Sequence, residues 1–229
     1  MTSFADSRLI VVGGHTRNIG KTQLICEIVG ALPQAGWIAG KITQFGHGLC
    51  TRHGSPCDCA PASDEAALVW ETAGDRGTDS ARFLAAGARK SFWLRTRVGR
   101  LAEAMPLLRA ELARAAAENA SAPANVILES NSLLGFVKPA LYIAVIHPGQ
   151  ADFKDSARAM LTRANAIVLR EELPKATELV GGAPDSGWAS VLQLIRGKRR
   201  FLQAPGDPLP AGLVGMLSSV LAGDPQLLA

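Results

Sequence analysis

A glycine-rich segment followed by a lysine and a threonine is the part of this sequence that is best suited to chemistry. Residues 11–24 read VVGGHTRNIGKTQL. Glycine lets the backbone turn so that successive N–H groups face a phosphate, and the N-terminus of a following helix adds partial positive charge. In such a phosphate-binding loop (P-loop), Lys21 contacts the terminal phosphates and the Thr22 hydroxyl binds Mg²⁺.

The candidate nucleotide contacts are the loop, the start of the following helix and two residues further along the chain: Gly14, His15, Thr16, Arg17, Asn18, Ile19, Gly20, Lys21, Thr22, Gln23, Lys41 and Asp79. The strict loop pattern has glycine where His15 lies, and Gly14 is one residue further back. The base is left open between ATP and GTP, because residues 170–173 read REEL where a GTPase usually has Asn/Thr-Lys-x-Asp.

Charge neutralisation at the phosphates needs a carboxylate as well as the lysine. Glu129 ends the apolar run Val126–Leu128, at the sheet edge where α/β folds bind ligands. We expect Lys21 and Glu129 to be the catalytic pair, with Thr22 and Glu129 at Mg²⁺; the alternative for Glu129 is a helix cap or a salt bridge. Asp79 either caps a helix over residues 80–86 or contacts metal or substrate. Lys41, at a predicted strand end, contacts phosphate or acidic substrate unless it is merely solvated.

A segment rich in cysteine and histidine lies between two predicted elements. Residues 44–63 read QFGHGLCTRHGSPCDCAPAS and are rich in Gly, Pro and Ser, as a loop is. Cys50, Cys57, Cys59 and His53 form a candidate four-ligand set for Zn²⁺ or an iron–sulfur cluster. A reactive thiol pair at Cys57 and Cys59, or plain surface thiols, are the alternatives. The fourth cysteine, Cys26, is expected to be a small buried hydrophobe on a helix.

The elements that must position these residues alternate along the chain. Apolar runs predict strands at 9–12, 37–43, 91–94, 125–129, 141–147 and 166–169, and helical spacing predicts helices at 21–34, 65–72, 100–119, 152–165 and 213–221. The strands are almost continuously apolar, which favours a sheet covered on both faces. We therefore predict a three-layer α/β fold with a mostly parallel sheet, formed as one domain over residues 1–229. The region 187–229 is left as an extension of unassigned role, and the basic run 196–200 as a solvated turn.

Composition sets further limits. Charged residues make up 19% of the 229 residues, and the net charge of +4 is too small to indicate nucleic acid or an anionic membrane as partner. No apolar run approaches the ~18 residues of a spanning helix, and residues 1–8 do not have the pattern of a signal peptide. We therefore expect a cytoplasmic protein with reduced thiols.

Three further motifs give the chain a family resemblance. Residues 40–47 read GKITQFGH, residues 77–80 read GTDS with AGA at 86–88, and the strand of Glu129 ends ILES. In this order the motifs resemble those of the molybdopterin-guanine dinucleotide biosynthesis protein B (MobB) family over residues 8–170. The spacing from Gly14 to Gly20 resembles that of dethiobiotin synthetase, within the branch that includes MinD-type ATPases. Ser130 and Asn131 replace the glycine that senses the γ-phosphate in such proteins.

The resemblance implies a P-loop protein that binds a nucleoside triphosphate with Mg²⁺, hydrolyses it slowly and assists nucleotide attachment to the molybdenum cofactor. Molybdopterin or a partner biosynthetic enzyme would then be a partner, and a homodimer is expected. Two alternatives remain open at the level of sequence. One is an ATP-dependent ligase or kinase similar to dethiobiotin synthetase. The other is a metal-delivery or metal-sensing protein whose cysteine loop responds to nucleotide.

Overall fold

An eight-stranded sheet forms the centre of the molecule, in the order β3-β4-β2-β5-β1-β6-β7-β8. The computed structural model describes residues 8–46, 66–75, 77–118, 124–150, 152–173 and 188–224. Its strands are β1 (Arg8–Gly14), β2 (Ile38–Phe45), β3 (Ala67–Trp70), β4 (Lys90–Arg97), β5 (Asn125–Glu129), β6 (Leu141–Ile146), β7 (Ala166–Leu169) and β8 (Arg199–Leu202). Every neighbouring pair is parallel except β3 with β4.

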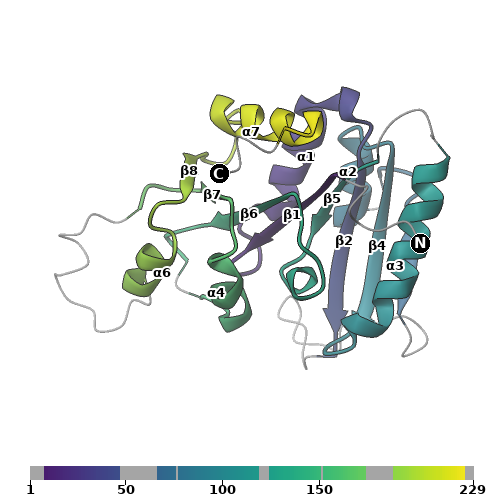
Figure 1. Cartoon of the computed structure of the whole chain (residues 1–229), viewed down its shortest axis with the longest axis horizontal. Coiled ribbons are helices and arrows are strands. Elements are labelled where there is room, and N and C mark those ends of the chain that lie inside the picture. The colour runs from purple at the N-terminus through teal and green to yellow at the C-terminus, as the bar shows by residue number, and fades with distance from the viewer. Residues whose placement is uncertain are drawn as a thin grey trace.

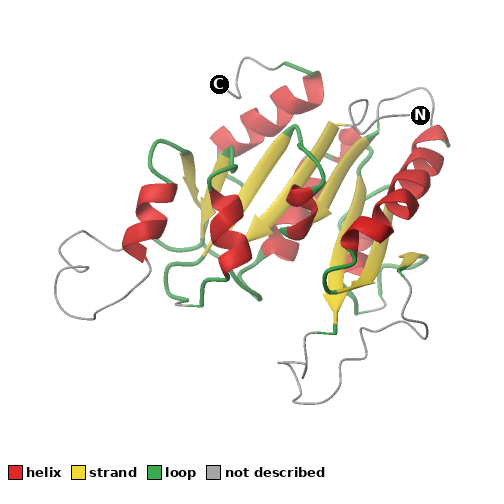
Figure 2. Ribbon diagram, turned by 60° about the horizontal axis from the view of Figure 1, so that its bottom comes forward, coloured by secondary structure: helices red, strands yellow, loops and turns green. Residues whose placement is uncertain are grey.

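Helices cover both faces of this sheet (Figures 1 and 2). They are α1 (Lys21–Ala31), α2 (Asp79–Ala85), α3 (Leu101–Ala117), α4 (Asp155–Leu161), α6 (Trp188–Leu194) and α7 (Ala211–Ala222), with short 3₁₀ turns at η2 (Pro33–Ala35) and η3 (Ser132–Gly135). Successive residues of a strand point to opposite faces. Ile10 and Val12 accordingly pack with α1, α2 and α7, whereas Leu9 and Val11 pack with α3, α4 and α6. The predicted three-layer α/β fold is confirmed.

The strand order brings the candidate residues to one edge of the sheet. β1 leads directly into the glycine-rich segment and pairs with β5, where Val12 lies opposite Glu129. β5 also pairs with β2, where Lys41 lies opposite Glu129. Because the carboxyl ends of parallel strands share one edge, the strand pairing alone places Glu129 between the loop and Lys41.

Two expectations from the sequence need correction. Residues 65–72 do not form a helix but contribute β3, an antiparallel edge strand beside β4. Ala66, Leu68 and Trp70 alternate towards the core on the α3 side, so a period of two describes the segment. The expected turn over the basic run 196–200 is present only at residues 196–198, because Arg199 and Arg200 pair with β7 and lie in β8.

The helices also differ in extent from the prediction. Helix α4 begins at Asp155, three residues later than expected. Helix α3 is a single helix with Pro106 in its interior. The last predicted amphipathic segment lies within α7, which buries Leu213, Met216, Leu217 and Val220 against the α1 side of the sheet. In the described part of the chain, no helix has both the length and the apolar character needed to cross a membrane.

Candidate nucleotide-phosphate site

The glycine-rich segment forms a turn that opens the N-terminus of α1. Gly20 is the N-cap residue with φ +85°, and Asn18 also has a positive φ of +56°. Gly20 provides no side-chain cap, and the first turn of α1 contains no acidic residue. The first N–H groups of a helix have no intrahelical acceptor, so this end of α1 offers donors and partial positive charge to an anion. The turn thus joins a buried strand to a helix end suited to an anion, which is the arrangement of a phosphate-binding loop.

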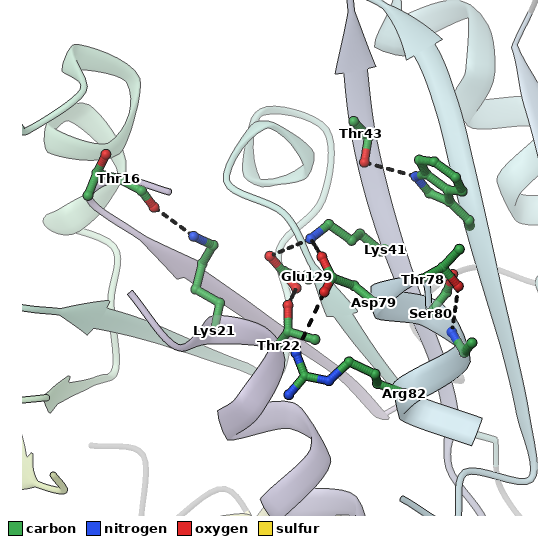
Figure 3. A network of polar contacts seen from close by, with 12 residues as sticks. Thr16, Lys21, Thr22, Lys41, Thr43, Thr78, Asp79, Ser80, Arg82 and Glu129 are labelled. Carbon is green, nitrogen blue, oxygen red and sulfur yellow. Dashed lines mark hydrogen bonds and ion pairs between the residues drawn. The ribbon is translucent and has the colours of Figure 1, made fainter. Parts of the chain in front are cut away.

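Lys21 folds back over the loop instead of pairing with a carboxylate. Its Nζ donates to the Thr16 carbonyl oxygen at 2.6 Å, as Figure 3 shows. Burial is the main cause that lowers the pKa of Lys21 to about 8; the Glu129 carboxylate opposes this shift, and the Lys41 and Lys154 charges lower the pKa further. Within the described residues Lys21 makes no direct ion pair, so a phosphate can pair with this partly buried ammonium.

Thr22 and Glu129 present two oxygen atoms side by side next to this lysine. The Thr22 hydroxyl donates to Glu129 Oε2 at 2.6 Å, and Glu129 is only 6% exposed. Mg²⁺ prefers hard oxygen ligands and is usually held by one or two protein groups together with phosphates and waters. A hydroxyl and a buried carboxylate beside an anion-binding helix end fit that requirement, so Thr22 and Glu129 are the residues that would hold Mg²⁺.

Lys41 reaches Glu129 from the other side (Figure 3). Its Nζ lies 3.3 Å from Glu129 Oε1 and also pairs with Asp79, whose second oxygen lies 3.7 Å from Arg82. Burial lowers the pKa of Lys41, but the Glu129 and Asp79 carboxylates outweigh it and raise the pKa above its ordinary value. Lys41 therefore carries a charge that the protein already neutralises.

The structure corrects the expected local settings of Lys41 and Asp79. Lys41 lies inside β2 rather than at its end, because β2 continues to Phe45 along β4. Asp79 is the first residue of α2, and the cap is Thr78, whose hydroxyl accepts a hydrogen bond from the Ala81 N–H at 3.0 Å. A capping Thr78 leaves the Asp79 carboxylate for Lys41, so the ion pair replaces the predicted cap.

Asn131 clamps the start of the loop, a role that the sequence did not reveal. Its Oδ1 accepts from the Gly14 N–H at 2.9 Å, and its Nδ2 donates to the Gly14 carbonyl at 2.7 Å. A Cβ atom added at Gly13 would lie 2.1 Å from Asn131 Oδ1. Gly13 is thus needed for the close approach of this amide, and Gly14 bonds to the amide through its backbone.

The residues after β6 support the next part of the loop. His15 is 1% exposed; its ring lies 4.9 Å from the Phe153 ring centroid and its Nε2 lies 3.3 Å from the Gln150 carbonyl. Burial lowers the pKa of His15. The Thr16 hydroxyl bonds to Asp152. His15 and Thr16 therefore hold the loop in place through the segment that follows β6.

The other predicted loop residues divide between surface and core. Arg17 and Asn18 are exposed at the loop tip. Ile19 is 1% exposed and packs in the core with α1. Gln23 donates to Glu27 at 3.0 Å and accepts from Arg82 at 2.8 Å, which joins α1 to α2.

The predicted metal loop falls outside the described residues. Cys50, Cys57, Cys59 and His53 all lie in the range 47–65, and their ligation stays a prediction. Within the described residues, no group of three or more His, Cys, Asp or Glu side chains is placed to hold a metal. Cys26 is half-buried beside the α1-side core, its thiol lies 3.6 Å from the Arg82 carbonyl, and burial raises its pKa.

Comparisons with known proteins add a similarity among solved structures. No family profile matches the chain, and no curated protein matches it in sequence. Among solved structures, the chain is similar to HypB from Helicobacter pylori, determined in complex with nickel. The TM-score is 0.45 at 14% identity, over 97% of this chain and 90% of that one. The fold assignment rests on the strand order and the loop described above.

Proposed function

We propose that this protein binds a nucleoside triphosphate with Mg²⁺ and hydrolyses it slowly. The observation that carries the proposal is the contact between Thr22 and Glu129 at the uncapped N-terminus of α1, beside Lys21. Three requirements for a triphosphate meet at that point: N–H donors, a partly buried ammonium group that bonds to a backbone carbonyl, and two oxygens for a hard cation.

Each side chain has a distinct part in this mechanism. Lys21 leaves the Thr16 carbonyl and contacts the β- and γ-phosphates. The negative charge of the phosphates stabilises the ammonium form, which burial disfavours. Thr22 and Glu129 would hold Mg²⁺, which when bound would neutralise the charge on the transferring phosphoryl group. Glu129 is also the carboxylate available to orient a water, while Lys41 keeps its second oxygen in place.

Loss of the lysine tests this proposal. Lys21→Ala is expected to weaken binding of ATP·Mg and GTP·Mg by about 100-fold, as for loss of a charge-assisted contact with phosphate. Both nucleotides are titrated by calorimetry because the base is not specified by the residues after β7. Lys198→Ala is the matched control, since Lys198 also donates to backbone carbonyls, at 2.8 Å, and burial also lowers its pKa. Equal affinity of wild type and Lys21→Ala would contradict the proposal.

The finer role that we propose is assistance in attaching a nucleotide to the molybdenum cofactor, as the MobB resemblance implies. Its support is that Lys41 and Asp79, from two separate motifs of that resemblance, pair directly beside Glu129. A reconstituted reaction with molybdopterin and a partner biosynthetic enzyme tests this role. Wild-type protein is expected to raise the yield of nucleotide-bearing cofactor, and Lys21→Ala is expected not to.

An ATP-dependent ligase or kinase is the second candidate, favoured by the spacing from Gly14 to Gly20, which resembles that of dethiobiotin synthetase. Such an enzyme consumes ATP only when a carboxylate, amine or hydroxyl acceptor is present. Measuring phosphate release with and without a panel of acceptors separates the two candidates. Hydrolysis that is indifferent to every acceptor would favour the accessory role.

A further inference from the structure

A buried arginine connects the C-terminal part of the sheet to the phosphate loop. Arg170 follows β7 and is 2% exposed. Its Nη2 donates to the Gly20 carbonyl at 2.6 Å, and its Nη1 donates to Gln203 Oε1 at 3.0 Å. One planar guanidinium thus joins the loop residue before Lys21 to the residue that follows β8.

Gln203 is held in turn by two other elements. It is fully buried, its N–H donates to the Leu169 carbonyl at 2.8 Å, and its side-chain Nε2 donates to Glu27 Oε2 at 2.8 Å. Glu27 lies on α1, so the network returns to the helix that the loop opens. The contacts therefore attach α1 to the end of β8 at two points. Arg170 holds the N-cap residue of α1, and Gln203 holds Glu27 further along α1.

The contact with Gly20 controls where the next N–H group points. The peptide unit is planar and trans, so fixing the Gly20 carbonyl also fixes the Lys21 N–H on the opposite side of the same unit. The Gly20 carbonyl also accepts the Leu24 N–H at 2.9 Å, the first hydrogen bond of α1. A Cβ atom at Gly20 would lie 2.9 Å from Arg170 Nε, so a residue with a side chain would displace the guanidinium.

We propose that Arg170 is a positioning residue for the phosphate loop, and that β8 holds it in place through Gln203. The inference rests on the proposed function. Arg170 acts through Gly20 and does not touch the nucleotide, because its guanidinium is buried beneath the loop. Nucleotide binding and the order of β8 are then linked, and by linkage each strengthens the other. Strand β8 and Gln203 thereby support the phosphate loop through Arg170.

Two substitutions separate positioning from simple structural support. Arg170→Lys keeps the charge but lacks the planar fork that spans two acceptors. Gln203→Leu leaves Arg170 intact and removes its side-chain acceptor Oε1, so that only the longer contact with the Gln203 carbonyl, at 3.4 Å, remains. Each is expected to raise the Kd of ATP·Mg and GTP·Mg by about tenfold, the effect of one charge-assisted hydrogen bond. Arg163→Lys is the matched control, because Arg163 also donates to two backbone carbonyls, those of Leu134 and Val137, away from the loop.

Hydrogen exchange of the β8 amides provides a measurement that a purely structural role of Arg170 would not change. Saturating ATP·Mg or GTP·Mg is expected to slow exchange of the β8 amides in wild type and in Arg163→Lys, and to slow it much less in Arg170→Lys. Melting temperature without nucleotide is recorded for every variant. The inference would be overturned if both Arg170→Lys and Gln203→Leu had a lower melting temperature but the wild-type Kd. It would also be overturned if nucleotide did not change the exchange rate of the β8 amides in wild type.

The same titrations distinguish failure of this inference from failure of the proposed function. Wild type that binds neither nucleotide would overturn both. Wild type that binds, with binding lost in Lys21→Ala but retained in Arg170→Lys and Gln203→Leu, would overturn only the positioning role. If Arg170→Lys does not fold, Gln203→Leu decides the result through its Kd and its β8 exchange.

Discussion

The two lysines of the site sit in opposite electrostatic settings. Lys21 donates to a backbone carbonyl, and its pKa falls to about 8, mainly through burial. Lys41 lies between two carboxylates, and its pKa rises above the ordinary value because their attraction outweighs burial. The difference indicates that Lys21, which makes no direct ion pair within the described residues, can accept an added anion, whereas Lys41 is already paired with two carboxylates.

Glu129 connects the two lysine environments, so its charge should matter most. Glu129→Gln is expected to slow phosphate release about 100-fold, because the amide neither neutralises Lys41 nor serves as a good Mg²⁺ ligand. Steady-state hydrolysis of ATP and GTP at saturating nucleotide measures the effect. Glu103→Gln is the control, since the Glu103 side chain is 60% exposed on α3. Turnover at the wild-type rate would mean that Glu129 only supports Lys41.

The pH dependence of binding should follow Lys21 and not Lys41. Phosphate favours the charged form of Lys21, so above the free-protein pKa of about 8 binding must take up a proton. Affinity is then expected to fall about tenfold per pH unit as the pH rises above that value. Calorimetric titrations from about pH 7 to about pH 9 measure this slope. Lys21→Arg, which stays protonated, should flatten it; a slope unchanged in that variant would assign the proton elsewhere.

The two lysines should also differ in their effect on stability. Lys41→Met removes the partner of a buried carboxylate and is expected to lower the free energy of unfolding by about 1–3 kcal/mol. Lys21→Met removes a desolvated charge and should cost nothing or stabilise the nucleotide-free protein. Urea unfolding at neutral pH compares them. Equal losses of unfolding free energy in Lys41→Met and Lys21→Met would contradict the proposed difference between the two lysine environments.

The lowered pKa of Lys21 also determines how the stability of the nucleotide-free protein changes with pH. The folded-state pKa of Lys21 lies below its ordinary value of 10.5, so the unfolded chain binds more protons between about pH 8 and 10.5. Lys21 therefore makes the nucleotide-free protein more stable as the pH rises through that window. The Lys21→Met protein should lack this gain.

The smallest effect is expected at the exposed end of the Lys41 network. The Asp79 side chain is 39% exposed, and exposed ion pairs contribute little. Asp79→Asn should change the free energy of unfolding by less than about 1 kcal/mol and should lower the pKa of Lys41. Urea unfolding and NMR titration of the Lys41 ammonium check both. A loss as large as that of Lys41→Met would make Asp79, and not Glu129, the main partner.

Several features of the site follow from local sequence because local chemistry determines them. A buried strand, a glycine-containing turn and an amphipathic helix in succession predict the loop, and a carboxylate that ends an apolar run predicts Glu129 at the same edge. The helix predicted at 65–72 is wrong, since a short apolar run has no length to separate a helical period from an alternating one. For Asp79 the sequence left a helix cap and a metal or substrate contact open; the cap alternative is wrong because the neighbouring Thr78, also a good capping residue, takes that position.

Local patterns are therefore enough to predict the fold class and the loop, and to select Lys21, Thr22 and Glu129 as its candidate polar groups. The clamp of Asn131 on Gly14 and the contact of Arg170 with Gly20 come instead from tertiary structure. These pairs are separated by 117 and 150 residues along the chain. Such contacts depend on strand order and burial, which bring the ends of β5, β7 and β8 against one loop. A short-range sequence pattern does not contain information about that arrangement. The residues around Asn131 and Arg170 therefore do not indicate which loop these two side chains contact.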